Sequence, residues 1–392
     1  MTPFNLGKLP RIYFGPGKLA ELPRLMAESA KSALIITGAS SFYGSEKWKK
    51  LTDELTSRGI THFHVSVKGE PSPDMVDDIA GQYRGKKPGL VIAIGGGSVM
   101  DAGKAVSAML PKNETVKHYL EGFQGAGVHD GVKTPFIAIP TTSGTGSEAA
   151  KNAVLSRVGP DGYKRSIRHD NFVPDISIVD PELMLSCLPS VTAACGMDAF
   201  VQLLESFVST NASQLSDALA LSGLEQVRDS LVTAYRDGNN LAARTGMAYA
   251  ALMSGITLSH AGLGVVHGFA SVLGGFFAIP HGVICGTLIG AATWTNIRYL
   301  KDLGEGNPFL EKYARTGALL ARREYTPENR DDHLDFLVRQ LDEWTETFRM
   351  PRLGAFGVGF QDINRIIHHT GNKNNPVKLD KDGIKEILTA SI

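Results

Sequence analysis

Two kinds of hydrophobic pattern alternate along the first half of the chain. Short apolar runs that end in glycine or polar residues alternate with segments in which apolar residues recur every three or four positions. These patterns predict strands over 32–38, 61–67, 89–98 and 135–142, and helices over 46–59, 73–85 and 100–110. This alternation predicts βαβ units and a parallel sheet. The run at 91–94, VIAI, is apolar on both faces, which favours a sheet covered on both sides.

The pattern changes after the segment ISIVDPELMLSCLP at 176–189. From there the helical period prevails, and it predicts helices over 191–210, 213–236, 240–259, 264–279, 283–300, 308–321, 330–347 and 360–368. A chain of 392 residues is also long for a single core. We therefore predict an α/β domain over residues 1–188 and an all-α domain over residues 189–392.

Composition indicates a folded protein and excludes some kinds of partner. Apolar residues make up 43% of the chain, and 40 basic residues balance 40 acidic ones. No basic stripe predicts nucleic-acid binding, and no polybasic cluster predicts a membrane surface. The N-terminus has no signal-peptide pattern, and three scattered cysteines fit a reducing, cytoplasmic compartment: Cys187, Cys195 and Cys285.

The most apolar stretch, residues 261–279, has the length of a membrane span. It contains His267 and five glycines, and Pro280 follows it directly. We therefore expect a buried helix beside a functional site, and no membrane span.

A glycine-rich turn follows the strand that ends near residue 95. The sequence IAIGGGSVMDAGKA (92–105) matches neither the Walker A nor the GxGxxG pattern. Glycines let a ligand approach the backbone, and a helix N-terminus favours phosphate. A plain strand-to-helix turn is the alternative, but Gly95, Gly96, Gly97 and Ser98 favour a phosphate site.

A second polar loop, PTTSGTGSEAA (140–150), also follows a strand and offers the hydroxyls of Thr141, Thr142 and Ser143. Ligands of open α/β sheets bind at the carboxyl ends of the strands, so the two loops predict one nucleotide site, with a solvated loop as the alternative. After the first strand stand Gly38, Ser40 and Ser41, without the acid that commonly binds the ribose of NAD. This absence favours NADP.

Polar residues also interrupt the apolar helices of the second half. Asp198 and Gln202 lie four residues apart in GMDAFVQLLES (196–206) and therefore share a helix face. His267 and His281 would be about 21 Å apart on one straight helix, so they meet only if the chain turns near Gly274, Gly275 and Pro280. Imidazoles and a carboxylate favour Fe²⁺ or Zn²⁺, although each histidine taken alone is equally typical of a core residue.

The segments GGGSVMDAGKA, PTTSGTGSEA, ISIVDPELM, GMDAF and GLGVVHGFAS…IPHG occur in this order. In these segments the chain resembles the iron-containing (group III) alcohol dehydrogenase family over nearly its whole length. The resemblance implies a Rossmann-like dinucleotide-binding domain, an all-helical domain and a divalent metal in the cleft between them, a dehydroquinate synthase-like architecture. It also implies interconversion of alcohols and aldehydes or ketones with NAD or NADP, and a homo-oligomer such as a dimer.

Site residues follow from the matched positions. The nucleotide set is Gly38, Ser40, Ser41, Gly95, Gly96, Gly97, Ser98, Asp101, Lys104, Thr141, Thr142, Ser143 and Thr145. Asp198, His267 and His281 match three of the family's four metal ligands, and Gln202 stands where the fourth is usually histidine. Ser271 stands where many members have a histidine thought to relay the proton. Both departures put tight metal binding in question.

The substrate expected from this pattern is a small alcohol or carbonyl compound polarised by the metal. His267, His281 and Ser271 are the candidate catalytic residues, with Ser271 or water passing the proton. A metal-independent reductase of the maleylacetate reductase type, with protons from His267, His281 or His260, is the first alternative; a non-catalytic nucleotide-binding paralogue is the second. Candidates for the cleft wall are Phe269, Phe276, Phe277, Lys164 and Arg165.

Overall fold

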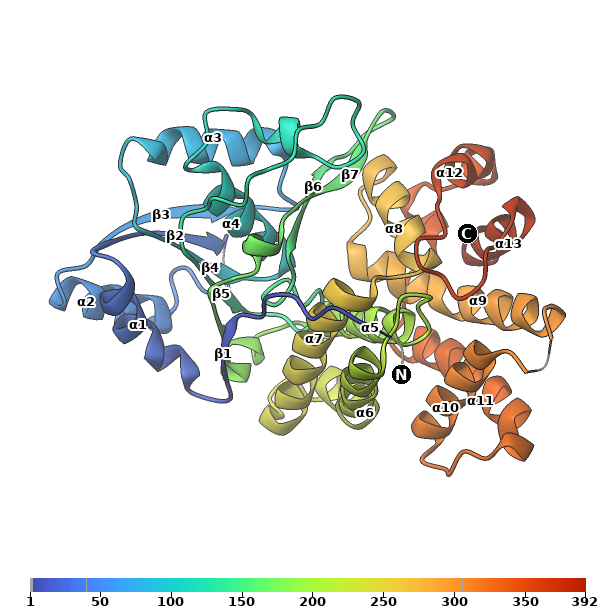
Figure 1. The fold of residues 1–392 in the computed structure, drawn as a ribbon. Helices are drawn as coiled ribbons and strands as arrows, with labels where there is room; N and C mark the ends of the chain where they lie inside the picture. The colour runs from blue at the N-terminus through green and yellow to red at the C-terminus, as the bar shows by residue number, and fades with distance from the viewer. Residues whose placement is uncertain (1–2, 40, 305) are drawn as a thin grey trace.

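A helix-covered sheet is followed in sequence by an all-helical half in the computed structural model, which describes residues 3–39, 41–304 and 306–392 (Figure 1). The sheet is parallel, with the order β1-β8-β5-β4-β2-β3. Its strands are β1 (Arg11–Phe14), β2 (Ser32–Gly38), β3 (Thr61–Val67), β4 (Leu90–Gly95), β5 (Phe136–Pro140) and β8 (Ile176–Val179). The predicted parallel sheet is confirmed. Strands β1 and β8 were not predicted, because four residues are too few to display a period.

Helices cover both faces of the sheet, as the two-sided apolar strands require (Figure 1). One face packs on α1 (Leu22–Ser29) and α2 (Glu46–Ser57), and the other on α3 (Pro73–Arg84) and α4 (Gly97–Met109). Side chains alternate along β2, so Ala33 and Ile35 join the first core while Leu34 and Ile36 join the second. Gly95 ends β4, and α4 begins two residues later at Gly97.

A hairpin of two antiparallel strands, β6 (Asn152–Arg157) and β7 (Tyr163–Arg168), lies between the sheet and the helical half (Figure 1). The sequence patterns did not predict it, because neither strand is a continuous apolar run and three of the six residues of β7 are charged. A Cβ on Gly275 would lie 2.8 Å from the backbone of Tyr163. The glycine pair at 274–275 therefore lets the hairpin pack closely on the following helical domain.

The second half is helical throughout its long elements, as predicted. Its helices are α5 (Pro189–Phe207), α6 (Gln214–Arg236), α7 (Leu241–Ala261), α8 (Val265–Phe276), α9 (His281–Asp302), α10 (Pro308–Ala321), α11 (Arg330–Thr347), α12 (Ile363–His369) and α13 (Lys381–Ser391). Helix α13 was missed. Short 3-10 turns lie at Lys18–Glu21, Val116–Tyr119, Asp170–Phe172, Pro181–Met184, Pro327–Asn329, Leu353–Phe356 and Phe360–Asp362. Strand β8 ends nine residues before the predicted domain boundary at 188, and α5 begins directly after it.

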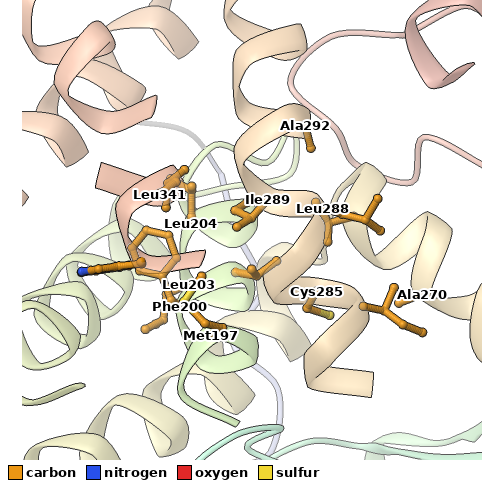
Figure 2. Close-up of a cluster of buried hydrophobic side chains, with 14 of the residues drawn as sticks. Met197, Phe200, Leu203, Leu204, Ala270, Cys285, Leu288, Ile289, Ala292 and Leu341 are labelled. Atoms are coloured by element: carbon orange, nitrogen blue, oxygen red, sulfur yellow. The ribbon is translucent and has the colours of Figure 1, made fainter. Parts of the chain in front are cut away.

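Helices α5 and α9 form the centre of the helical core. Figure 2 shows Met197, Phe200 and Leu203 of α5 beside Leu288 and Ile289 of α9. The predicted buried helix around His267 is α8, most of which is buried. Within residues 3–39, 41–304 and 306–392, no single helix is long and apolar enough to cross a membrane; α7 and α8 together reach that length but bend by 100°.

Candidate active site

A cavity of about 420 Å³ lies between the sheet domain, the β6–β7 hairpin and the helical half. Residues of the predicted nucleotide site and of the predicted metal site line this one cavity. The predicted nucleotide residues on this wall are Gly97, Ser98, Asp101 and Thr145, and the predicted metal-side residues are Gln202, His267, Ser271 and His281. The cavity lies at the carboxyl ends of β4 and β5, where ligands of parallel sheets bind.

The nucleotide side of the cavity is made of backbone. Helix α4 begins at Gly97, with Gly96 as its N-cap, so its first N–H groups have no partner within the helix. The second loop is tied to the first, because the amide of Thr141 donates to the carbonyl of Gly95 at 2.8 Å. A Cβ on Gly97 would lie 2.7 Å from the methyl of Thr145, so this approach requires glycine. The arrangement presents a helix N-terminus to an anion.

The other predicted nucleotide residues lie away from the cavity wall. Gly38 ends β2, Ser41 is exposed beyond it, and Ser40 lies outside the described residues. Thr142 and Ser143 line a small separate pocket, where the Ser143 hydroxyl donates to the sulfur of Met184 at 2.9 Å. Their contact with a nucleotide stays a prediction.

Lys104 lies behind the wall and is fully buried. Its ammonium donates to four oxygens at 2.7–3.0 Å: the carbonyls of Ser147, Ala150 and Asn152 and the hydroxyl of Ser147. Burial lowers the pKa of Lys104 to about 8, against the opposing effect of Asp101 and Glu148. The lysine thus joins α4 to the second loop and β6. Its predicted contact with the cofactor has no support in this geometry.

Four ligand atoms converge on the helical side of the cavity. The carboxylate of Asp198, the imidazoles of His267 and His281, and the thiol of Cys285 each place one atom within 4.8 Å of the others. Asp198 Oδ1 lies 3.5 Å from His267 Nε2 and 3.6 Å from His281 Nε2. Bonds of about 2.0–2.3 Å in a tetrahedron separate the ligands by roughly 3.3–3.8 Å, so these spacings fit a metal ion. The chain turns between α8 and α9 as predicted, and the two rings are 5.3 Å apart.

This cluster leaves buried polar atoms without hydrogen bonds. Asp198 Oδ1, Gln202 Oε1 and His281 Nδ1 have no hydrogen-bond partner among the described residues. Burial alone would raise the pKa of Asp198, but the neighbouring His281 and His267 lower it to about 2. Burial lowers the pKa of His281 to about 4. The ionised Asp198 and the neutral His281 are in the protonation states that bind a cation. Burial opposes a charge on His267, but Cys285, Asp198 and Glu205 raise its pKa above the ordinary value, so His267 must release a proton when a cation binds.

Two members of the site were missed by sequence reasoning. Glu205 accepts from the backbone of Val266 and lies 2.7 Å from His267 Nδ1, which directs the other ring nitrogen, Nε2, toward the cluster. Cys285 lies 3.8 Å from the Nε2 atoms of both histidines. Both were detectable by helical spacing, since Glu205 is seven residues after Asp198 and Cys285 four after His281.

A predicted proton donor and several predicted residues of the cavity wall lie elsewhere. His260 accepts from the amide of Gly7 in a different cavity. Phe269 is fully buried, and Phe276 and Phe277 pack against the helical core, so the predicted aromatic lining is wrong; Leu258 and Leu263 take its place. Lys164 and Arg165 do line the cavity, through β7. Ser271 donates to the carbonyl of His267 at 2.9 Å.

Comparisons with known proteins agree with this geometry. The family model for iron-containing alcohol dehydrogenase matches residues 10–181, and the model for the C-terminal part of that family matches residues 192–392. Alcohol dehydrogenase 4 of Saccharomyces cerevisiae is 30% identical over 97% of this chain and 96% of its own. An NADPH-dependent butanol dehydrogenase of Clostridium saccharobutylicum is 31% identical over 97% and 96%. The structure of an archaeal halo-thermophilic alcohol dehydrogenase from a Red Sea brine pool superposes with a TM-score of 0.90 at 25% identity, covering 100% of this chain and 99% of that one.

Proposed function

The chain belongs to the iron-containing alcohol dehydrogenase family, and we propose that it interconverts an alcohol and an aldehyde or ketone by hydride transfer with NAD(P)(H), aided by Fe²⁺ or Zn²⁺. One observation carries the proposal. His267 and His281, whose ring nitrogens converge with the carboxylate of Asp198, line the same cavity as the N-terminus of α4. A hydride donor and a carbonyl held there would share one space shielded between two domains.

The donor set fits a divalent cation. Asp198, His267 and His281 would hold it, and the unpartnered Gln202 Oε1 and the nearby Cys285 sulfur are the candidates for a further ligand. A bound cation acts as a Lewis acid that polarises the carbonyl oxygen. Glu205 keeps His267 in the ring orientation that presents Nε2 to the cavity.

The nucleotide side binds and orients the cofactor. The free N–H groups at Gly97 and Ser98 attract the pyrophosphate, and Thr145 sets the width of the loop beside them. We propose NADP in preference to NAD, because Gly38 and Ser41 put no carboxylate at the end of β2. The NADPH dependence of the butanol dehydrogenase relative is consistent with this choice.

Carbonyl reduction also consumes one proton. Ser271 lies one helical turn after His267, on the cavity wall. Its hydroxyl, together with water, is the group we place on the proton path in the absence of a second histidine. Hydride from the cofactor and this proton convert the carbonyl compound to the alcohol.

A chelation assay tests the proposal. NADPH oxidation is followed with butanal before and after removal of metal, and again after Fe²⁺ or Zn²⁺ is added back. We expect activity to disappear and return with the metal. A large gain in iron-dependent activity in Gln202→His is also expected, since imidazole binds these metals better than an amide. Full activity without metal would favour the metal-independent reductase, and NADPH binding without turnover the non-catalytic paralogue.

We further propose that the physiological substrate is a small molecule, that the enzyme is a homo-oligomer, and that it works in the cytoplasm. The three cysteines are free, as expected in a reducing compartment. Light scattering in solution and measurement of activity in cell fractions test the last two points.

A further inference from the structure

One ammonium group on the cavity wall forms no ion pair with a carboxylate of the described residues. Lys373 lies in the loop between α12 and α13, and its Nζ donates to the hydroxyl of Ser271 at 3.3 Å. Two other cations on the wall form ion pairs with neighbouring carboxylates. Lys164 pairs with Glu70 at 2.5 Å, and Arg168 pairs with Glu121 at 2.8 Å.

Arg165 adds a second cation that no carboxylate neutralises. Its Nη1 donates to the backbone carbonyl of Glu121 at 2.9 Å, and its guanidinium lies 4.7 Å from the centre of the Phe123 ring. Its Nε is buried without a hydrogen-bond partner among the described residues. The carboxylate of Asp101, also on the wall, faces the buried Lys104. The wall therefore carries more positive than negative charge.

The loop that carries Lys373 is held in place on both sides. Asn372 exchanges two hydrogen bonds with the backbone of Leu379, both at 2.9 Å, and the amide of Asn374 donates to the carbonyl of Leu263 at 2.9 Å. Lys373 itself has φ of +50°, a left-handed conformation that lysine rarely adopts. Such a conformation persists only where the surroundings determine it, and it fixes where the side chain starts.

From this geometry we infer that Lys373 and Ser271 form an anion subsite, and that the preferred substrate is a carbonyl compound carrying a carboxylate or a similar acidic group. This inference rests on the proposed function and narrows its substrate class. A charge-assisted hydrogen bond from Lys373 would hold the acidic group, and the charge excess of the wall would attract it.

The spacing of the subsite sets the length of the substrate. Ser271 follows His267 by four residues on α8, a rise of about 6 Å. We take this rise as the separation between an acidic group at Lys373 and a carbonyl oxygen beside the His267 ring, which corresponds to roughly a two- or three-carbon spacer. Four-carbon oxo acids meet this requirement.

Two aldehydes of equal length test the inference. 4-Oxobutanoate and butanal differ in the terminal carboxylate, and the wild type should show a kcat/KM at least 10-fold higher for the oxo acid. In Lys373→Met we expect the ratio of the two kcat/KM values to fall about 10- to 100-fold, mostly through KM. Lys373→Arg should recover most of the preference. Lys378→Met, which alters an exposed lysine of the same loop, is the matched control and should keep the wild-type ratio.

The rival role for Lys373 is proton donation through Ser271. In that case Lys373→Met would lower kcat for both aldehydes by the same factor and leave the ratio unchanged, and this result would overturn the subsite. A wild-type kcat/KM for butanal equal to or higher than that for 4-oxobutanoate would also overturn the subsite.

A binding measurement separates this inference from the proposed function. Calorimetry in the presence of NADPH, with which an alcohol cannot react, compares the binding of 4-hydroxybutanoate with that of butan-1-ol without turnover. The wild type should bind the hydroxy acid at least 10-fold more tightly than Lys373→Met does. If the wild type and Lys373→Met bound 4-hydroxybutanoate with equal affinity, the subsite would be contradicted whatever the aldehyde assays give. A wild type that binds the hydroxy acid but turns over neither aldehyde would contradict only the proposed function.

Discussion

Two buried polar clusters lie beside the same cavity, and they differ in whether their hydrogen bonds are complete. The ammonium of Lys104 is surrounded by four protein oxygens. The carboxylate oxygen of Asp198 and the amide oxygen of Gln202 have no hydrogen-bond partner among the described residues, although both are buried. Burying a polar group without a partner is costly, so a protein keeps such a group only for a reason.

The difference separates a structural cluster from a functional one. Both contain charged residues that belong to family motifs, and burial alone does not distinguish them. Lys104 uses its bonds to join three segments of the N-terminal half. Asp198 keeps its oxygen open toward two imidazoles and a thiol. We therefore expect changes at Lys104 to act on stability and changes at Asp198 to act on metal and rate.

The largest effect on activity is expected for Asp198→Asn. Loss of the anionic ligand should lower kcat at least about 1000-fold, because the polarising metal contributes several kcal/mol. Metal analysis should find the cation lost, while NADPH affinity, measured by fluorescence, should stay near the wild-type value. The free energy of unfolding of the metal-free protein should fall only modestly, because the pKa of Asp198, lowered to about 2, shows that the two imidazoles stabilise its charge in the folded state. If metal-free Asp198→Asn were several kcal/mol less stable than the metal-free wild type, the distinction between a structural cluster at Lys104 and a functional one at Asp198 would be lost.

The opposite profile is expected for Lys104→Met. Removing the ammonium leaves three buried carbonyls without their donor and takes a nearby positive charge from Asp101, so the free energy of unfolding should fall by about 3–5 kcal/mol. Urea denaturation measures this change. The variant should still bind one metal per folded chain, and loss of the metal from folded protein would contradict the separation.

The pH dependence of stability provides a third test, through Glu148. Burial raises the pKa of Glu148 from its ordinary value near 4.5 to about 7, so between these pH values the folded state keeps a proton that the unfolded chain has released. Its stabilising effect is complete at low pH and is lost as pH rises from about 4.5 to 7, by up to roughly 3 kcal/mol. Glu148→Gln cannot titrate, so its denaturation midpoints should lack this slope. An equal slope in both proteins would exclude Glu148 as its source.

The smallest effect belongs to Glu205→Gln. The amide keeps a contact with His267 but no longer enhances the basicity of the ring, so metal affinity should fall about 10- to 100-fold. Competition with a chelator of known affinity measures this change. Activity at saturating metal should recover in large part, whereas in Asp198→Asn it should not. A metal affinity equal to the wild type would show that Glu205 only fills space.

The fold was largely predictable because its strands are apolar on both faces and its helices keep a regular period. The failures are short elements or elements with weak periods. Strands β1 and β8 have four residues each, α1 has eight, half of the residues of β7 in the hairpin with β6 are charged, and α13 follows a long polar loop. Asp198, His267 and His281 were grouped by spacing together with family resemblance. Glu205 and Cys285 share a helix face with a predicted ligand, but they were missed because helical spacing alone does not show which way α5 and α9 face α8.

The direction in which side chains point explains the remaining differences between the sequence predictions and the structure. Lys104 belongs to the motif of the first loop, but its position on α4 points it behind the wall instead of into the cavity. Lys373 lies about one hundred residues after Ser271 in a loop without a period, so no sequence pattern joins them. Such contacts depend on tertiary packing, which a single sequence does not display.

Metal titration of the stripped enzyme tests the central claim most directly. The apo protein, saturated with NADPH and substrate, is titrated with Fe²⁺ or Zn²⁺ while activity is recorded. We predict that activity rises linearly from near zero and levels off at one metal per chain, and that Asp198→Asn shows no rise at the same concentrations. Full activity before any metal is added, in protein verified to be metal-free, would contradict the account.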